Sequence, residues 1–446
     1  MGVILFMSKH VEELVDRKCR EIVDRKNIHE VGRVAGIKNY IIEVEGLDGA
    51  AYFEKIVIDG KAEGYVSTIG RNRIYVALIR KTEEIYVGDA VHATGVEFKG
   101  IFSPDSIGHI VDMFGVDRMN DQKFDNTIEL AIETPPIPIM DRGNVKRPMQ
   151  TGVTGIDMIY PVGKGQRQLI IGDKRTGKTQ LCLDAIVNQK GRDMICIYIA
   201  IGKTKKEIKN VFYELLKRGA MEYTIIISAF NDEFPPVIKT TPFMGLAVAE
   251  KYMLEGKDVL VCIDDLKRHA DVCREIGLLT GTVPGRDAYP SDIFYTHARL
   301  LERGCQHKDG GSVTILPICE TKGGDITDYI SSNIISITDG QIVLSTKNFE
   351  KGNKPAIEYG LSVSRLGGAV QTREMKAVGA VVRRELLAYL EKCDVYELAN
   401  EDEMSPELLK SMRNGKAIRN KLRQYKFSPI PPEEMQHMFD GLVDLG

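Results

Sequence analysis

The octapeptide Gly172-Asp173-Lys174-Arg175-Thr176-Gly177-Lys178-Thr179 fits the pattern G-x-x-x-x-G-K-[ST]. It lies between an apolar run, 169–171, and a helical pattern that begins at Gln180. This is the strand–loop–helix context that a phosphate-binding loop requires. Its glycines let backbone N–H groups curl around phosphate oxygens, and the following helix adds positive charge at its N-terminus. We therefore predict that this octapeptide and Gln180 bind the nucleotide, with Lys178 on the terminal phosphates and Thr179 on Mg²⁺.

Apolar runs of strand length alternate with helical patterns on both sides of this loop. The runs are 168–171, 195–201, 223–227, 259–263 and 313–318. Strands that alternate with helices favour a mostly parallel sheet with helices on both faces. The sequence thus predicts an α/β fold around the phosphate loop.

Three further regions flank this α/β pattern. Residues 1–27 carry apolar positions at helical spacing, and 28–95 carry short β-rich runs punctuated by glycine, which is typical of a small barrel. Beyond residue 375 the leucines recur at helical spacing. We therefore predict an N-terminal helical segment (1–27), a β-barrel domain (28–95), a nucleotide-binding domain (96–375) and a small helical C-terminal domain (376–446).

The composition restricts the partners and the compartment. Among 446 residues, 60 Lys+Arg against 63 Asp+Glu give a net charge of −3, without the basic excess that favours nucleic acid. The eight cysteines form no C-x-x-C pair, which fits a reducing compartment. No apolar stretch approaches the roughly 20 residues that span a bilayer, and the first residues do not resemble a signal peptide. We expect a cytoplasmic protein that binds no nucleic acid and reaches a membrane only through partners.

Acidic residues decide what the site does with a bound nucleotide. The strand 259–263 is followed by Asp264 and Asp265; we assign Asp264 to the Mg²⁺ shell and Asp265 to loop or capping structure. Hydrolysis also needs a carboxylate that polarises the attacking water. The strand 195–201 is followed by Gly202 and Lys203, with no acid before Glu207, which we interpret as a solvated first-turn residue of a helix. The sequence therefore predicts a nucleotide site that does not hydrolyse.

Several segments, in order, resemble the alpha subunit of F-type ATP synthases over almost the whole chain. They are 147–152, 165–169, the phosphate loop, 288–295, 300–303, 327–344 with its Ile-Ser-Ile-Thr-Asp-Gly-Gln core, and 360–365. The resemblance implies an N-terminal β-barrel, a central RecA-like nucleotide domain and a C-terminal helical bundle. It also implies ATP or ADP with Mg²⁺ as ligands. In the family, glutamine in alpha and the catalytic glutamate in beta follow the strand that here ends at Gly202, so Lys203 departs from both.

The resemblance further implies partners in a rotary, ion-transporting ATPase. Alpha subunits alternate with catalytic beta-type subunits in a hetero-hexameric ring around a central, gamma-type stalk, peripheral to the inner face of the cell membrane. Arg365 matches the arginine that alpha points into the neighbouring beta site as an arginine finger. A planar, permanently charged guanidinium can bridge oxygens of a transferring phosphoryl group. Residues 283–287 resemble the loop that faces the stalk.

The match is less complete near the end of the chain. Residues 423–429 resemble the family's adenine-side segment Lys-Gln-Gly-Gln-Tyr-Ser-Pro, with Gln424 retained and Lys426 in place of the second glutamine. Both are predicted to contact the nucleotide. The sequence stops soon afterwards, where family members continue for several helices. We therefore expect a shortened C-terminal domain and a divergent F-like ATPase.

Three alternatives remain open at this point. The chain could hydrolyse ATP itself as a homohexameric RecA-like ATPase of the secretion type, which would need the carboxylate that Lys203 replaces. It could be an RNA-dependent helicase of the Rho kind, which the near-neutral charge disfavours. It could also be a structural ring member without nucleotide, which the intact phosphate loop disfavours.

Overall fold

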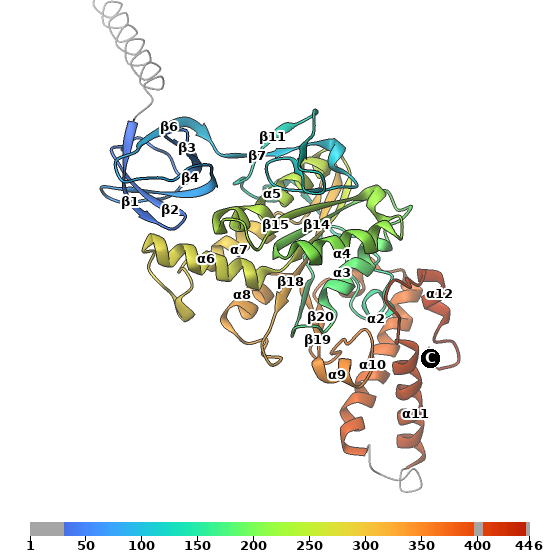
Figure 1. The fold of residues 1–446 in the computed structure, drawn as a ribbon. Coiled ribbons are helices and arrows are strands. Elements are labelled where there is room, and N and C mark those ends of the chain that lie inside the picture. Colours follow the sequence, from blue (N-terminus) through green and yellow to red (C-terminus); the bar gives the residue numbers. More distant parts are fainter. Residues whose placement is uncertain (1–30, 397–404, 443–446) are drawn as a thin grey trace, which may run out of the picture. The chain divides into compact units, whose positions relative to one another are not determined.

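The computed structural model describes residues 31–396 and 405–442. The predicted helical segment 1–27 lies outside the described residues. Contacts divide the chain into two compact units. The first runs to Lys99 and includes Phe234–Pro236 and Ile276–Thr282; the second holds the remainder. Figure 1 shows the fold, coloured along the sequence.

Six strands of the first unit close into a barrel in the order β1-β2-β5-β4-β3-β6. They are β1 (Val31–Lys38), β2 (Ile41–Glu45), β3 (Glu54–Ile58), β4 (Ala62–Ile69), β5 (Ile74–Lys81) and β6 (Ala90–Glu97). Every pairing in the barrel is antiparallel. The side chains of Ile42, Val44, Ile56, Val76 and Val91 are fully buried. The predicted β-barrel is confirmed, and its apolar interior is what holds it together.

A large sheet organises the second unit. Its strand order is β10-β9-β8-β15-β14-β16-β18-β13-β19-β20, and β12 joins it through β17. The central strands are β13 (Leu169–Gly172), β14 (Met194–Lys203), β15 (Thr224–Phe230), β16 (Asp258–Asp264), β18 (Gly310–Glu320) and β19 (Gly340–Leu344). All of their mutual pairings are parallel. Each of the five predicted apolar runs is a strand of this parallel core.

Shorter strands extend and decorate this sheet. They are β7 (Lys99–Phe102), β8 (Ile110–Val111), β9 (Val116–Asp117), β10 (Gln122–Lys123), β11 (Ile128–Ala131), β12 (Arg142–Gly143), β17 (Gln306–His307) and β20 (Val363–Ser364). β7 and β11 form a separate two-stranded sheet. β20 pairs antiparallel with β19, so it ends the sheet on that side.

Helices alternate with the parallel strands, and one short helix comes before β13 and another after β19. They are α2 (Thr154–Asp157), α3 (Lys178–Val187), α4 (Lys205–Leu216), α5 (Pro235–Leu254), α6 (Leu266–Thr280), α7 (Ile293–Leu301), α8 (Tyr329–Ile337) and α9 (Thr346–Glu350). The chain runs from β13 to β14 to β15 in one direction across the sheet and then turns back through β16 and β18. Right-handed crossovers therefore place α3 and α4 on one face and α5 to α8 on the other. This confirms the predicted two-faced α/β fold.

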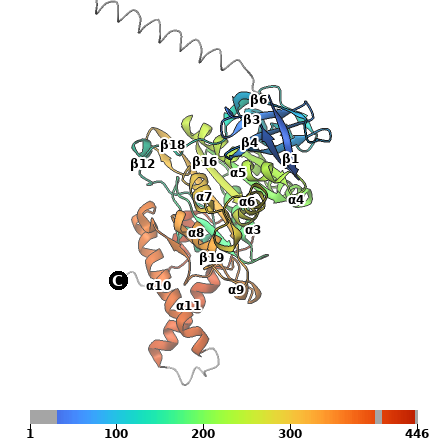
Figure 2. The ribbon, with the colours of Figure 1, turned by 90° about the vertical axis from the view of Figure 1, so that its left-hand side faces the viewer.

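Three helices follow the sheet: α10 (Arg373–Tyr396), α11 (Pro406–Lys421) and α12 (Pro432–His437). α10 and α11 lie side by side in both views (Figures 1 and 2). A Cβ on Gly415 of α11 would meet the Cβ of Tyr389 of α10 at 2.1 Å, so the two helices can approach this closely only because position 415 is glycine. Contacts do not separate these helices from the sheet. The boundaries 96–375 and 376–446 therefore stay a prediction.

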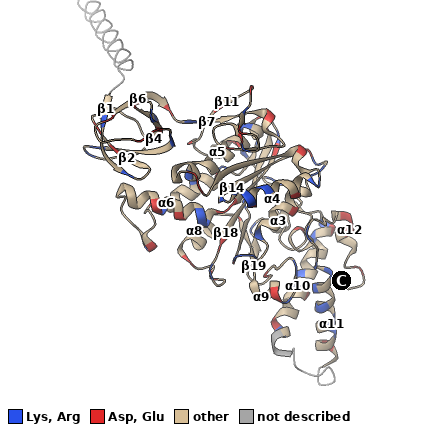
Figure 3. Cartoon of the chain, viewed as in Figure 1, with Lys and Arg blue, Asp and Glu red and all other residues tan. Residues whose placement is uncertain are grey.

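Two surface properties complete the description. None of the helices among the described residues combines the length and the apolar character that a bilayer crossing needs. Figure 3 shows basic and acidic residues interspersed along the described chain, in keeping with its net charge of −3.

Candidate nucleotide site

The phosphate loop joins the end of β13 to the start of α3, as predicted, although α3 begins at Lys178, two residues before the predicted helical pattern. Arg175 and Gly177 adopt positive φ values of 61° and 101°, which turn the backbone N–H groups to one side of the loop. A Cβ on Gly172 would lie 2.5 Å from the carbonyl oxygen of Leu344. Only glycine therefore fits where the loop leaves the sheet.

Lys178 lies inside the loop rather than in solvent. Its Nζ donates a hydrogen bond to the carbonyl oxygen of Asp173 at 2.5 Å, which holds the ammonium at the centre of the turn. Burial lowers the pKa of Lys178. The carboxylates of Glu320, Asp265 and Asp264 act in the opposite direction but do not outweigh the burial. Within the part of the chain that the structure describes, the ammonium has one hydrogen-bonded carbonyl, so two of its three donors can serve a phosphate.

The predicted phosphate residues Asp173 and Lys174 have different surroundings. The Asp173 carboxylate accepts hydrogen bonds from the Thr321 hydroxyl at 2.7 Å, the Gly324 N–H at 2.8 Å and the Thr346 hydroxyl at 3.2 Å. Burial raises its pKa, but these hydrogen bonds outweigh burial and lower it overall. Lys174 is exposed, and its Nζ lies 3.5 Å from Glu320. The Asp173 side chain therefore joins loops of the protein, while its backbone belongs to the phosphate loop.

The two predicted metal residues meet at the carboxyl edge of the sheet. The Thr179 hydroxyl donates to Asp264 Oδ2 at 2.7 Å, and the Tyr198 hydroxyl donates to the same oxygen at 2.8 Å. Asp264 ends β16 and is buried. A hydroxyl and a carboxylate beside a phosphate loop are the donors that Mg²⁺ uses there, with water and phosphate oxygens completing its shell. Thr179 and Asp264 therefore fit a magnesium ion that arrives with a nucleotide.

Lys203 reaches the same carboxylate from the end of the neighbouring strand. Its Nζ lies 2.7 Å from Asp264 Oδ1 and 3.6 Å from Asp265 Oδ2. Burial opposes the charge of Lys203, but the two carboxylates outweigh it and raise the pKa. At the sequence position considered above for a water-polarising carboxylate, the structure places the ammonium of Lys203.

The other acids near the end of β14 and β16 have structural partners. Asp265 accepts the backbone N–H of Arg268 at 2.7 Å and so caps the start of α6, as predicted. Glu207 forms a capping box with Thr204 at the start of α4, which confirms it as an exposed first-turn acid. Both carboxylates therefore help to begin a helix.

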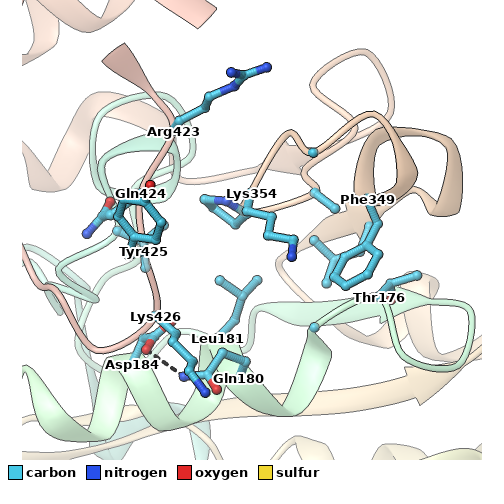
Figure 4. A pocket seen from close by; sticks show the side chains of 16 residues that line it. Thr176, Gln180, Leu181, Asp184, Phe349, Lys354, Arg423, Gln424, Tyr425 and Lys426 are labelled. Carbon is cyan, nitrogen blue, oxygen red and sulfur yellow. Dashed lines mark hydrogen bonds between the residues drawn. The ribbon is translucent and has the colours of Figure 1, made fainter. Parts of the chain in front are cut away.

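A cavity of about 560 Å³ extends from the phosphate loop towards the C-terminal helices. Figure 4 shows Gln424 and Tyr425, from the loop after α11, across the cavity from Thr176, and Lys426 of the same loop beside Gln180 and Leu181. Phe349 and Lys354 complete the wall, and the Lys354 ammonium lies over the Phe349 ring, 4.6 Å from its centroid. Gln180, Gln424 and Lys426, which the sequence predicted as nucleotide contacts, are therefore brought together beside the loop.

Gln424 is held firmly in this wall. Its amide oxygen accepts the Thr154 N–H at 3.0 Å, and its amide nitrogen donates to the carbonyl of Gly152 at 2.6 Å. The Gln180 amide donates to Asp184 Oδ1 at 2.8 Å. Tyr425 is 89% exposed, so its ring is available to a flat ligand.

Arg365 stands apart from these residues. It follows β20 at the edge of the sheet and is exposed, and it does not line the cavity. Its backbone N–H donates to Asp339 O at 2.9 Å, and its Nη2 donates to Ile335 O at 3.2 Å. The guanidinium therefore belongs to the surface of the chain and not to the chain's own site.

Comparison with known proteins decides the family. The description "ATP synthase alpha/beta family, nucleotide-binding domain" matches residues 152–364. The "ATP synthase subunit alpha" of Lactobacillus acidophilus is 38% identical over 432 residues, 96% of this chain and 85% of that protein. The protein of the same name from Lactobacillus gasseri is 38% identical over 439 residues, 97% and 86%, and that of Streptococcus agalactiae is 38% identical over 432 residues, 96% and 85%. This chain belongs to the ATP synthase alpha subunit family. The resemblance predicted from the sequence is confirmed, and the matched domain supports binding of ATP or ADP.

Sequence reasoning missed three residues of this alpha-family site. Glu320 ends β18, and its backbone pairs in register with Gly172, so an acid lies beside the phosphate loop. Its signal was available, since Glu320 follows the apolar run 313–318. Phe349 lies in the short helix α9 and Lys354 in the loop after it; neither belongs to a sequence pattern, and only folding brings them to the cavity.

Proposed function

We propose that this alpha-family chain binds Mg-ATP or Mg-ADP at its own phosphate loop without hydrolysing it. Residues 172–180 would hold the phosphates, Thr179 and Asp264 the Mg²⁺, and Gln424 and Lys426 the base end. The observation that carries the proposal is Lys203, whose ammonium lies 2.7 Å from Asp264 where an acid would be needed. A lysine that stays protonated cannot polarise water for attack.

We further propose that Arg365 acts in the site of a neighbouring, catalytic beta-type subunit. The Arg365 guanidinium is exposed at the edge of the sheet and makes a hydrogen bond to Ile335 O, so it could enter the site of another protein without disturbing the fold of its own chain. The partners would be beta-type subunits in an alternating ring and a gamma-type central stalk, with residues 283–287 facing the stalk. Such a complex would lie on the inner face of the cell membrane, with this chain attached only through other subunits.

Glu320 supports a second candidate, in which the chain hydrolyses ATP itself. Its carboxylate is about a quarter exposed and lies 3.5 Å from the ammonium of Lys174. An acid beside the phosphate loop could orient water in the absence of one at position 203. The distance from Glu320 to a bound phosphate decides between the two candidates.

One experiment tests both candidates. The full chain, purified without partners, is assayed for ATP binding and for ATP turnover, together with the variants Lys178→Ala and Glu320→Gln. We expect binding without turnover in the wild-type chain. Turnover that both variants abolish would assign hydrolysis to this chain. Purification of the native complex with subunit counting then tests the ring, because a homohexamer of this chain would contradict the alternating arrangement.

A further inference from the structure

We propose that the Lys203 ammonium is a built-in cation of the nucleotide site, so that the chain keeps bound ATP when magnesium is removed. This inference rests on the proposed nucleotide binding. It adds that the positive charge of Lys203 contacts the phosphates. It follows from how the two oxygens of one buried carboxylate are used.

Adjacent strands bring the two charged groups together. β14 ends at Lys203 and β16 ends at Asp264, and Ala200 pairs in register with Asp264. The Asp264 side chain is 2% exposed and that of Lys203 is 23% exposed. The carboxylate is therefore sealed in the sheet, whereas the lysine side chain that it binds is partly exposed.

The two oxygens of Asp264 have different partners. Oδ2 accepts the hydroxyls of Thr179 and Tyr198, and Oδ1 lies 2.7 Å from Lys203 Nζ. Magnesium at a phosphate loop keeps several waters and needs a carboxylate oxygen to hold them. Because Oδ2 already accepts the two hydroxyls, Oδ1 is the oxygen that would hold the magnesium-bound waters. The Lys203 ammonium already donates to this oxygen, so it shares Oδ1 with any metal-bound water.

The remaining donors of Lys203 determine what it can do there. An ammonium has three N–H donors; Asp264 takes one, and Asp265 at 3.6 Å is too distant for a good hydrogen bond. At least one N–H is therefore left for a phosphate oxygen. Lys178 supplies a second ammonium from the loop itself. Two lysines can thus meet the triphosphate charge directly, which lowers its dependence on a metal.

The test compares the affinity of the full chain for radiolabelled ATP in excess Mg²⁺ and in EDTA by equilibrium dialysis. We expect the wild-type affinities to differ by less than about tenfold. In Lys203→Gln the affinity in EDTA falls a further ten- to hundredfold, the effect of one hydrogen bond to a charged group. The affinity in Mg²⁺ falls much less, since the metal can then use Oδ1.

Two variants control the comparison. Lys203→Arg keeps the charge and should keep ATP in EDTA. Lys205→Gln removes a lysine two residues away whose Nζ lies 3.3 Å from Asp232 at the exposed surface, and it should behave as wild type.

Three outcomes would overturn the inference. An unchanged ratio of affinities in Lys203→Gln contradicts the role of the ammonium but leaves nucleotide binding intact. If Lys203→Gln does not fold, the wild-type chain decides, because an affinity that falls by more than about tenfold in EDTA would show that the metal is required. A wild-type chain that binds no ATP in either buffer overturns the proposed function as well.

Discussion

Removal of the Arg365 guanidinium should separate catalysis from folding. The side chain is exposed, and its hydrogen bond to Ile335 O at 3.2 Å is worth at most about 1 kcal/mol. The backbone hydrogen bond to Asp339 O survives in Arg365→Ala. Chain stability and complex assembly should therefore hardly change. If the guanidinium acts on a transferring phosphoryl group, its loss costs about 10³- to 10⁵-fold in rate, or about 4 to 7 kcal/mol.

The assay is steady-state ATP hydrolysis by the complex reconstituted with its native partners. Thermal unfolding of the isolated chain is measured beside it. Arg365→Lys keeps the charge but not the planar fork, so its rate should lie between wild type and Arg365→Ala. Arg373→Ala is the matched control, because Arg373 is likewise exposed, at the start of α10. If Arg365→Ala complex hydrolyses within tenfold of the wild-type rate, the reasoning is wrong.

The remaining predictions concern the chain's own site and its stability. Lys178→Ala should weaken ATP binding by the isolated chain at least about tenfold, measured by dialysis. It should lower the ATPase activity of the assembled complex far less than Arg365→Ala does. Equal and total losses of activity in the two variants would place catalysis in this chain. Arg303 is fully buried and ion-paired with Glu250, so Arg303→Met should destabilise the chain by about 3 to 5 kcal/mol, seen as a lower urea midpoint, with part recovered when Glu250→Met is added. Burial raises the pKa of Asp258, but hydrogen bonds from basic and hydroxyl side chains outweigh it and lower the pKa below its usual range. The resulting stability is present above about pH 4 and lost as the pH falls below it. Asp258→Asn should therefore flatten the acid side of the stability profile, and an unchanged acid slope would contradict this.

Local patterns predicted the parts of this molecule that local forces determine. The phosphate loop needs glycine at fixed positions and a lysine at its end, so Gly172 and Lys178 were identifiable from spacing alone. The parallel strands were predictable because their burial on both faces leaves continuous apolar runs. The capping role of Glu207 was also readable, since Thr204 stands three residues before it.

Contacts between distant segments were beyond such patterns. Lys203 was recognised as the absence of an acid, but its distance of 2.7 Å from Asp264 depends on β14 and β16 being neighbours in register. The cavity joins the start of α3 to Phe349 and to the loop of Tyr425, which lie far apart in sequence. Such proximity follows from the strand order and the packing of the last helices, which no single segment encodes.

The Asp173 carboxylate forms hydrogen bonds to two segments on different sides of the phosphate loop. Its carboxylate binds the hydroxyl of Thr346, the first residue of α9, and that helix carries Phe349 in the cavity wall. The same carboxylate binds Thr321, next to Glu320 at the end of β18. The position of the phosphate loop is thus linked by hydrogen bonds both to the helix that carries Phe349 and to the strand end that carries Glu320. Replacement of Asp173 by alanine would remove both links at once, so we expect it to loosen both walls of the cavity, seen as faster amide hydrogen exchange in α9 and at the end of β18.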